Sequence, residues 1–279
     1  MMKETRAEYL AVDKLRPFDE HPFKVVDNEE MDQLTWSILT QGLLTPLVVR
    51  PLPNGEYEVI SGHRRLHACK KAGIETVPAL IYAIDRDAAA IALVDSNLQR
   101  EHILPSEKAF AYKLKLEAMN HQGRTSGQVG QKWTRDEIAE GESGRQVQRY
   151  IRLTNLIPGI LQKVDEGRIA LTPAVELSSL TDAEQEDLLE TMESEDCTPS
   201  LSQAIQMKAL SQSGQLDMDT IFHIMTQPKA NQQEKLSFKV SELRDYFPRH
   251  YTAAQMMQEI KVALKERQQR RARQRDHSR

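Results

Sequence analysis

The chain has 279 residues and a formal net charge of −4; 28% of its residues are charged and 5% are aromatic. This length allows two or three domains, and the low aromatic content favours a helical, modular protein over one large β core. The overall charge excludes a chain that binds nucleic acid simply by being basic throughout. The two cysteines, Cys69 and Cys197, have no metal-ligand spacing and suggest no disulfide framework, which points to a reducing, cytosolic compartment. We expect no signal peptide and no transmembrane helix, because no apolar stretch is long enough.

Residues 1–120 are predicted to form a small α+β domain. Short apolar runs bounded by proline, glycine and asparagine predict its strands. A helix is expected at 29–41, where apolar residues recur at helical spacing, Asp27 or Asn28 can cap the first turn, and Gly42 ends the pattern. The expected strands are 9–15, 47–50, 57–60 and 77–84, and a second helix is expected at 66–72.

Residues 121–225 are predicted to form an all-helical domain, and residues 226–279 a small C-terminal α/β unit. A polar stretch that contains glycine predicts a loop at 121–131. In the C-terminal unit we expect a strand at 236–240, an amphipathic helix carrying Met256, Ile260 and Leu264, and a basic tail that contacts a polyanion. The other expected helices are 87–94, 105–119, 134–140, 144–153, 158–166, 173–180, 182–193 and 200–211.

The segment Ser61-Gly62-His63-Arg64-Arg65 lies between a predicted strand and a predicted helix. Glycine at such a turn lets the backbone approach a ligand closely, and the helix that follows offers free N–H groups. Arg64 and Arg65 add fixed positive charge and forked hydrogen-bond donors. The segment predicts a phosphate-binding site, with a solvated surface turn as the alternative.

Two further segments flank this one, ILTQGLLTPLVVRP at 38–51 and DSNLQREHILPSEKAFAYKLKLEA at 95–118. In this order the three resemble the motifs of the ParB family of chromosome and plasmid partition proteins (ParB/RepB-like). Those motifs read approximately G-[I/L]-x-x-P-[I/L]-x-V-R-P, G-E-R-R-x-R-A and E-N-L-Q-R-x-x-L-x-P-x-E-x-A. They match Gly42–Pro51, Gly62–Ala68 and Ser96–Ala109 here, and the resemblance extends over residues 8–180. A plasmid or an integrative mobile element is the expected source.

The ParB resemblance implies that the first domain binds CTP together with Mg²⁺. In this family the phosphates are met by the G-E-R-R turn, the N-L-Q-R block supplies an oxygen to the metal, and the main chain of the first block reads the base. The implied cofactor-binding residues are Gly42, Pro46, Gly62, His63, Arg64, Arg65, Asn97 and Arg100, with Asn97 as the metal ligand.

Two positions depart from the ParB pattern. His63 and Ser96 occur where the family carries glutamate, and those acids are tied to metal handling and nucleotide turnover. Imidazole is a poor Mg²⁺ ligand and a serine hydroxyl is neutral, whereas a carboxylate is a hard ligand and a possible base. We therefore expect CTP binding with slow or absent hydrolysis, a weak CTPase at most, and assign no catalytic residue.

Residues 134–156 predict a helix-turn-helix unit, with helices at 134–140 and 144–153. Arginine and glutamine are the side chains that read guanine and adenine edges in the major groove. The alternative is an ordinary amphipathic helix with a solvated face. The candidate DNA-binding residues on the second helix are Arg145, Gln146, Gln148, Arg149 and Arg152.

The resemblance as a whole implies a cytoplasmic, nucleoid- or plasmid-associated homodimer that binds double-stranded DNA at a centromere-like site. CTP would close it into a clamp, and a ParA-type ATPase would move the complex. One alternative is a ParB-like transcription regulator. Another is an ATP-using enzyme of the sulfiredoxin fold, which His63 disfavours because sulfiredoxins carry cysteine in that turn.

Overall fold

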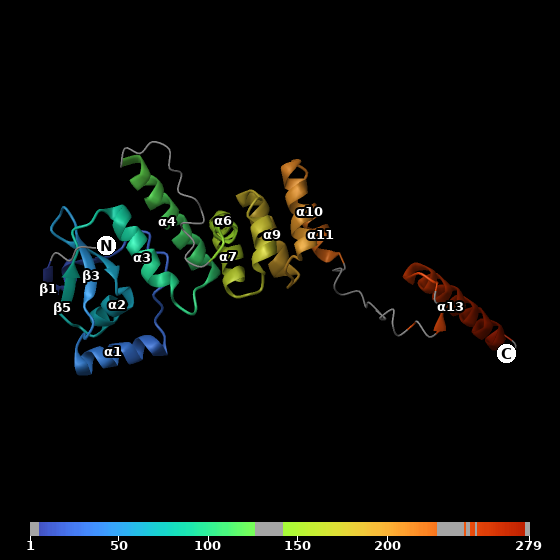
Figure 1. Ribbon diagram of the computed structural model, residues 1–279, viewed down its shortest axis with the longest axis horizontal. Helices are drawn as coiled ribbons and strands as arrows, with labels where there is room; N and C mark the ends of the chain where they lie inside the picture. The colour runs from blue at the N-terminus through green and yellow to red at the C-terminus, as the bar shows by residue number, and fades with distance from the viewer. Residues whose placement is uncertain (1–5, 126–141, 228–242, 244–245, 249, 277–279) are drawn as a thin grey trace. The chain divides into compact units, whose positions relative to one another are not determined.

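The computed structural model describes residues 6–125, 142–227, 243, 246–248 and 250–276 (Figure 1). The chain divides into two compact units, Met1–Gln227 and Pro228–Arg279. The first unit contains a β-sheet domain followed by a helical domain.

The sheet has five strands in the order β1-β5-β3-β4-β2. Antiparallel pairs join β1 to β5 and β3 to β4, whereas β5 pairs with β3, and β4 with β2, in parallel. The register of the β3–β4 pair shifts between Val48 and Val49. The strands are β1 Arg6–Ala11, β2 Leu15–Pro17, β3 Leu47–Pro51, β4 Tyr57–Ser61 and β5 Thr76–Ile81.

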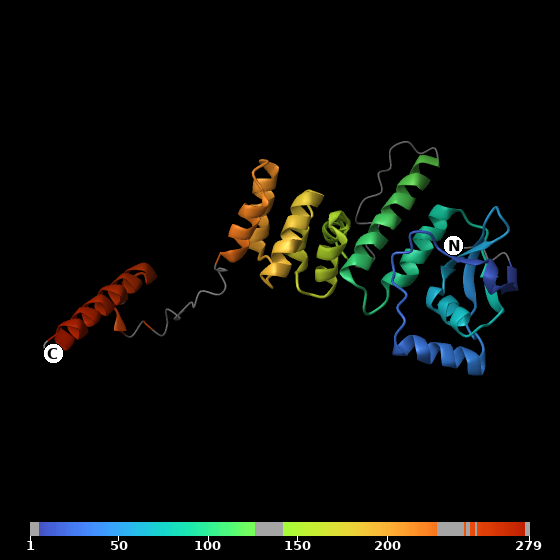
Figure 2. The same cartoon turned by 180° about the vertical axis from the view of Figure 1, so that it is seen from behind.

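Helices cover both faces of this sheet because its central strands carry apolar side chains on both sides. On β4, Val59 joins the core beneath α1 and α2, whereas its neighbour Ile60 joins the core beneath α3 and α4. Figures 1 and 2 show α3 and α4 lying side by side. The helices are α1 Glu29–Gln41, α2 His63–Lys71, α3 Arg86–Leu98 and α4 Pro105–Thr125.

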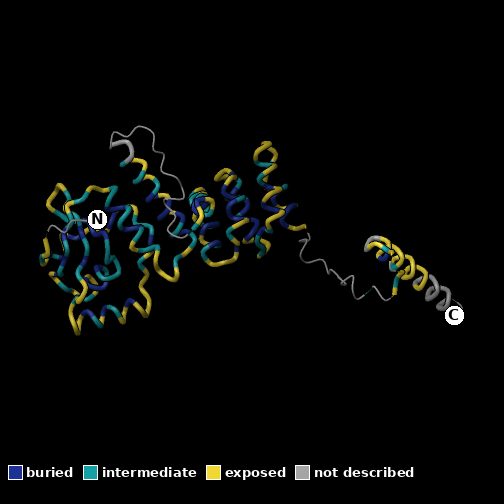
Figure 3. The backbone as a smooth tube through the Cα atoms, viewed as in Figure 1, coloured by how far each residue is buried: buried dark blue, intermediate teal, exposed yellow. Residues whose placement is uncertain are grey.

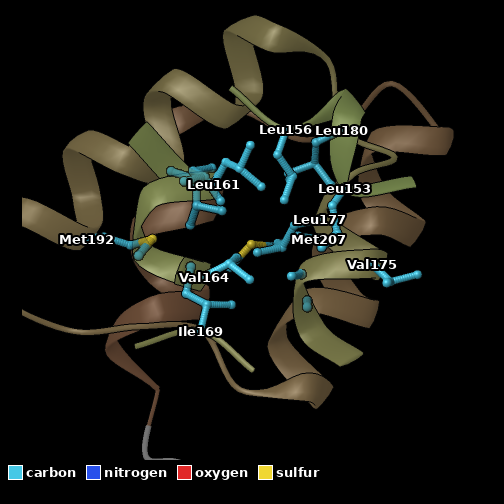
Figure 4. Packing of buried hydrophobic residues seen from close by; sticks show 14 of the residues in the cluster. Leu153, Leu156, Leu161, Val164, Ile169, Val175, Leu177, Leu180, Met192 and Met207 are labelled. Carbon is cyan, nitrogen blue, oxygen red and sulfur yellow. The ribbon is translucent and has the colours of Figure 1, made fainter. Parts of the chain in front are cut away.

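In the helical domain, the six helices of residues 142–227 pack around one apolar core, part of which is drawn in Figure 4. Leu153 and Leu177 are both fully buried in it. Thr181 and Ser200 begin two of the helices with complete capping boxes, which satisfy N–H groups that would otherwise lack partners. The helices are α6 Gly144–Arg152, α7 Pro158–Asp165, α8 Leu171–Leu177, α9 Asp182–Ser194, α10 Leu201–Gln212 and α11 Met218–Thr226.

In the second unit the main described element is α13, Ala253–Asp276. Met256 is buried, whereas Met257, Val262 and Leu264 are exposed, and Figure 3 shows that most of the described part of this helix faces solvent. None of the helices in the described part of the chain is long and apolar enough to cross a membrane.

The fold class expected for the first unit, an α+β domain followed by helices, is confirmed. The strand expected at 9–15 is wrong, because Val12–Lys14 form a 3-10 turn between β1 and β2. The loop expected at 121–131 is wrong for residues 121–125, through which α4 continues. The helix expected at 134–140 and the strand expected at 236–240 lie outside the described residues.

Candidate functional site

A pocket of about 590 Å³ opens in the first unit where four segments from three distant regions of the sequence meet. They are the loop before α1, α1 itself, the turn between β4 and α2, and the end of α3. This volume lies within the roughly 300–1,000 Å³ that small-molecule sites occupy. The lining residues are His21, Phe23, Lys24, Val25, Glu30, Gln33, Leu34, Ser61, Gly62, His63, Arg64, Arg65, Ser96, Asn97 and Arg100.

Gly62 makes the turn from β4 into α2 and has φ +104°, in the left-handed region. A Cβ at this position would lie 2.6 Å from Leu47 Cδ2 and 3.0 Å from Arg65 Nη2, so the turn requires glycine. Because Gly62 has no side chain, its N-cap position offers no acceptor to the first N–H groups of α2. These N–H groups, at the positive end of the helix dipole, favour an anion in the pocket.

The two arginines of the turn already have protein partners. Arg64 Nη2 donates a hydrogen bond of 3.0 Å to Glu30 Oε2 of α1. Arg65 Nη1 donates to the carbonyl oxygens of Thr45 and Pro46, at 2.6 and 2.8 Å. Arg65 therefore holds the loop before β3 against α2, while the more exposed Arg64 can exchange Glu30 for an anionic ligand.

Two further cations line the pocket from other segments. Arg100, after α3, places its Cζ 5.8 Å from the centroid of the Phe23 ring, a cation–π geometry. Lys24 reaches Asp165 Oδ2 of α7 with its Nζ, at 3.3 Å. The pocket thus gathers four cations, which favours an anionic ligand.

His63 is the first residue of α2, and its ring is held by the protein itself. Its Nε2 accepts a hydrogen bond from the Phe18 backbone N–H at 3.2 Å, and its ring packs against His21 with centroids 3.7 Å apart. Burial, together with the neighbouring His21 and Arg100, lowers the pKa of His63 to about 3, against an opposing backbone hydrogen bond to Val59. His63 is therefore a neutral side chain that braces the loop before α1.

His21 is also neutral. Its Nδ1 lies 2.7 Å from the Phe23 carbonyl oxygen, so this nitrogen carries the proton and donates. Burial lowers the pKa of His21. Its Nε2 is buried without a hydrogen-bond partner among the described residues, which leaves an unmatched acceptor beside the pocket.

The end of α3 forms the opposite wall. Asn97 Nδ2 donates to the Leu93 carbonyl oxygen at 2.8 Å, which leaves the Asn97 Oδ1 oxygen as the acceptor of that amide. Ser96 Oγ donates to the same carbonyl at 2.9 Å. Asp95 pairs with the buried Lys115 of α4, with Oδ1 and Nζ 2.6 Å apart, and is not a pocket residue. Asp95 therefore does not replace the carboxylate that position 96 lacks.

Six of the eight implied cofactor-binding residues line this one pocket, although they come from blocks more than 30 residues apart. Gly42 and Pro46 do not line it; Pro46 is linked to it through Arg65. The sequence did not indicate His21, Lys24, Glu30 or Gln33, because no spacing pattern connects the loop before α1 with α2. The residues brought together are Gly62, His63, Arg64, Arg65, Asn97 and Arg100.

A second candidate surface lies on α6. Ser143 caps this helix by accepting from the Gln146 N–H, and Val147 is buried against Tyr112 of α4. This packing leaves Arg145 and Arg152 exposed and Gln146, Gln148 and Arg149 half-buried.

Arg149 connects α6 to α8. Its Nη1 donates to Gln146 Oε1 at 3.1 Å and its Nη2 to Thr172 Oγ1 at 2.7 Å. The two neighbouring side chains are thereby held in fixed positions, and Thr172 is a positioning residue that the sequence did not indicate. The other predicted helix of the pair lies outside the described residues.

Comparison with known proteins identifies the family of this chain. Residues 1–98 match the ParB N-terminal domain family. The chain is 30% identical over 247 residues to the probable chromosome-partitioning protein ParB of Vibrio cholerae, and the alignment covers 88% of this chain and 80% of the relative. The chain belongs to the ParB family. This finding confirms the resemblance, whereas the plasmid or mobile-element source stays a prediction.

Two solved structures of C-terminally truncated ParB from Caulobacter crescentus are also similar. The one complexed to the centromeric parS site is 23% identical and covers 74% of this chain and 99% of that chain, with a TM-score of 0.43. The one complexed with CTP-gamma-S is 25% identical and covers 68% of this chain and 99% of that chain, with a TM-score of 0.33. Membership of the ParB family rests on the sequence matches.

Proposed function

We propose that this ParB protein acts in DNA segregation as a homodimeric clamp that loads at a centromere-like site when it binds CTP and Mg²⁺. It reads double-stranded DNA through α6, and a ParA-type ATPase moves the loaded complex. The protein works on the nucleoid or on a plasmid, in the cytoplasm.

The pocket carries this proposal. It joins a glycine turn, an open helix N-terminus and four cations in a volume suited to a nucleotide. Phosphates fit the α2 N-terminus together with Arg64, Arg100 and Lys24. The Gly42–Pro46 loop, which Arg65 holds through the Thr45 and Pro46 carbonyl oxygens, would read the base with its main chain.

Magnesium would take one protein ligand here, the Oδ1 oxygen of Asn97. Among the described residues no group of three or more His, Cys, Asp or Glu side chains could hold a metal ion. Mg²⁺ commonly keeps several waters and binds through substrate phosphates, so a single amide oxygen beside the phosphates suits it. The ion would neutralise phosphate charge, and the residues of this chain would orient the nucleotide.

The sulfiredoxin-like alternative gains no support from Cys69, the cysteine on α2. Cys69 is fully buried in the core beneath α1 and α2, and burial raises the pKa of its thiol. A protonated, buried thiol is a poor nucleophile. A ParB-like transcription regulator would use the same α6 surface, and the clamp experiment separates the two functions.

The clamp function is tested by retention on DNA of different topology. DNA fragments bound by the full chain are first recovered from sheared DNA of the source cell, and one is cloned into a circular plasmid. With CTP and Mg²⁺, we expect protein to stay on the circle through a high-salt wash and to leave the same DNA after it is linearised. Equal retention on both forms, or retention independent of CTP, contradicts a clamp and favours the regulator.

A further inference from the structure

The Lys24 side chain lines the pocket and also contacts the helical domain. It lines the pocket together with the side chains of Arg64 and Arg100. Its Nζ also lies 3.3 Å from Asp165 Oδ2, the last residue of α7, which is 141 positions away in the sequence. Lys24 therefore connects the pocket of the sheet domain directly to the helical domain.

Asp165 joins the end of one helix to the start of another. Its Oδ1 accepts from the Ser106 N–H at 2.9 Å, and its Oδ2 accepts from Ser106 Oγ at 2.6 Å. Ser106 is in the first turn of α4, where N–H groups lack helical partners, so Asp165 satisfies one of them. A carboxylate is favoured at that N-terminus but disfavoured at the C-terminal end of α7, where the dipole is negative.

The main chain of Lys24 is held where the end of α7 meets the start of α4, which we call the α4–α7 junction. Its N–H donates to Glu107 Oε1 at 2.8 Å, and Glu107 Oε2 also accepts from the Leu104 N–H at 3.1 Å. Glu107 is buried, so the loop before α1 is fixed to α4. The backbone of Lys24 is therefore anchored, while its Nζ can turn from Asp165 towards the pocket.

The ion pair of Lys24 and Asp165 is asymmetric. The Lys24 side chain is 59% exposed, whereas that of Asp165 is 8% exposed. Water can solvate the exposed Lys24 ammonium, so its release costs little on the lysine side and the cost falls on Asp165. Lys24 is the one cation that the described part of the chain pairs with Asp165, so its departure would leave a nearly buried carboxylate facing the negative end of α7.

We propose that Lys24 couples phosphate occupancy of the pocket to the α4–α7 junction, by exchanging the Asp165 carboxylate for a phosphate oxygen of the bound nucleotide. The inference rests on the proposed nucleotide site. A phosphate that draws Lys24 away weakens the hold of the sheet domain on α7, which packs against α4 and α9. By linkage, anything that pulls α7 from Ser106 frees Lys24 and tightens nucleotide binding.

The test is a mutant cycle read by calorimetric titration of the full chain with CTP and Mg²⁺. Lys24→Ala removes a phosphate contact and should weaken CTP binding about tenfold or more. Asp165→Asn keeps an oxygen acceptor for Ser106 but releases Lys24, so it should tighten CTP binding by about two- to fivefold. In the double variant the Asp165 substitution should have no further effect, because no lysine remains to be released.

Glu193→Gln is the matched control. It makes the same change of charge and breaks another ion pair of α7, that of Lys163 with Glu193 at 3.4 Å, remote from the pocket lining. It should leave the affinity for CTP unchanged. A shift equal to that of Asp165→Asn would mean that overall charge, and not the release of Lys24, raises the affinity, and would overturn the proposal.

A second measurement covers the case in which Asp165→Asn does not fold. Backbone amide exchange of α7 and the first turn of α4 is followed with and without CTP, and CTP should accelerate it in the unaltered chain but not in Lys24→Ala. If Asp165→Asn binds CTP with the affinity of the unaltered chain, the proposed coupling alone is overturned. The same holds if CTP changes amide exchange equally in the unaltered chain and in Lys24→Ala. No CTP binding by the unaltered chain overturns the proposed function itself, and this inference with it.

Discussion

His63 shows how one substitution changes what the pocket can do. Its Nε2 accepts a hydrogen bond from the Phe18 N–H and its ring packs on that of His21, so contacts within the protein hold the ring in place. With a pKa of about 3 it stays neutral at physiological pH. A neutral ring with occupied nitrogens neither binds Mg²⁺ well nor takes a proton from water.

The first prediction is that the unaltered chain hydrolyses CTP slowly or not at all, because positions 63 and 96 present no carboxylate. The double substitution His63→Glu and Ser96→Glu should raise the rate, measured as phosphate release in the presence of DNA. His67→Glu, outside the pocket lining but on the same helix, is the control. Brisk hydrolysis by the unaltered chain would refute the inference from the missing acids.

The second prediction concerns stability and pH. The folded-state pKa of His63, about 3, lies below the unfolded value of 6.5. The unfolded chain therefore binds the extra proton first, and stability that is full above pH 6.5 is lost as the pH falls towards 3. One such histidine costs about 1 kcal/mol between pH 6.5 and pH 5.5. His21, whose pKa burial also lowers, acts in the same direction.

Urea unfolding at about pH 7.5 and pH 5.5 measures this loss. His63→Gln, which keeps an acceptor for the Phe18 N–H, should lose about 1 kcal/mol less than the unaltered chain over this interval. The exposed His223→Gln should behave like the unaltered chain. Equal losses in all three proteins would show that His63 takes up its proton without unfolding.

At the scale of single elements, the turn from β4 into α2 depends on Gly62. The third prediction is that Gly62→Ala lowers the free energy of unfolding by roughly 2–4 kcal/mol, from left-handed strain and from the clash with Leu47. Gly73 also has a positive φ, +68°, but a Cβ at this position would meet no atom within 4 Å. Gly73→Ala should therefore lower the free energy of unfolding by only about 1 kcal/mol. Equal costs in thermal unfolding would mean that Leu47 moves aside freely.

The fourth prediction contrasts α6 with the basic C-terminal residues. Gln146→Ala should relax sequence preference, at about 1–3 kcal/mol for a lost base contact, because its side chain is held in place by Arg149. Deleting Arg270–Arg279 should weaken binding to all sequences equally and flatten the salt dependence, because a basic tail meets phosphates without reading bases. Both variants are measured on selected and random duplexes across a salt series. Loss of specificity on deleting the tail alone would reverse these assignments.

Local sequence patterns predicted some elements well and others poorly. α1 was predicted at its observed bounds because Asn28 caps it and Gly42 ends it. The strand expected at 9–15 failed because the chain passes from one edge of the sheet, β1, to the other, β2, within that stretch. Gly123 suggested a break, yet α4 continues past it, since one glycine costs a helix only about 1 kcal/mol.

Only those pocket residues that lie in ParB motifs could be predicted from the sequence. The ParB motifs supply the residues from Gly62 to Arg65, Asn97 and Arg100, which the structure places together. Lys24 carries no such motif, and its role depends on Asp165, 141 residues away. A contact over that distance follows from the tertiary structure and leaves no periodic signal in the sequence.

At the scale of the whole molecule, the first unit combines a pocket that favours an anion with α6, the proposed DNA-reading helix, and both α6 and α7 pack against α4. Lys24, Glu107 and Asp165 connect these parts through hydrogen bonds and one ion pair. On the proposed function, a nucleotide in the pocket would influence α6 without contacting it. This account depends first on whether the pocket binds a nucleotide.

Calorimetric titration of the full chain with CTP, ATP, GTP and UTP, each with Mg²⁺, tests that point directly. We predict preferential binding of CTP and a loss of about 10- to 100-fold in Arg64→Ala, since a charge-assisted contact is worth roughly 1.5–3 kcal/mol. Arg86→Ala is the control: Arg86 pairs with Glu20 at 2.9 Å much as Arg64 pairs with Glu30 at 3.0 Å, with similar exposure, but lies outside the pocket lining. Equal affinity for all four nucleotides, no binding at all, or equal losses in the two arginine variants would contradict the account.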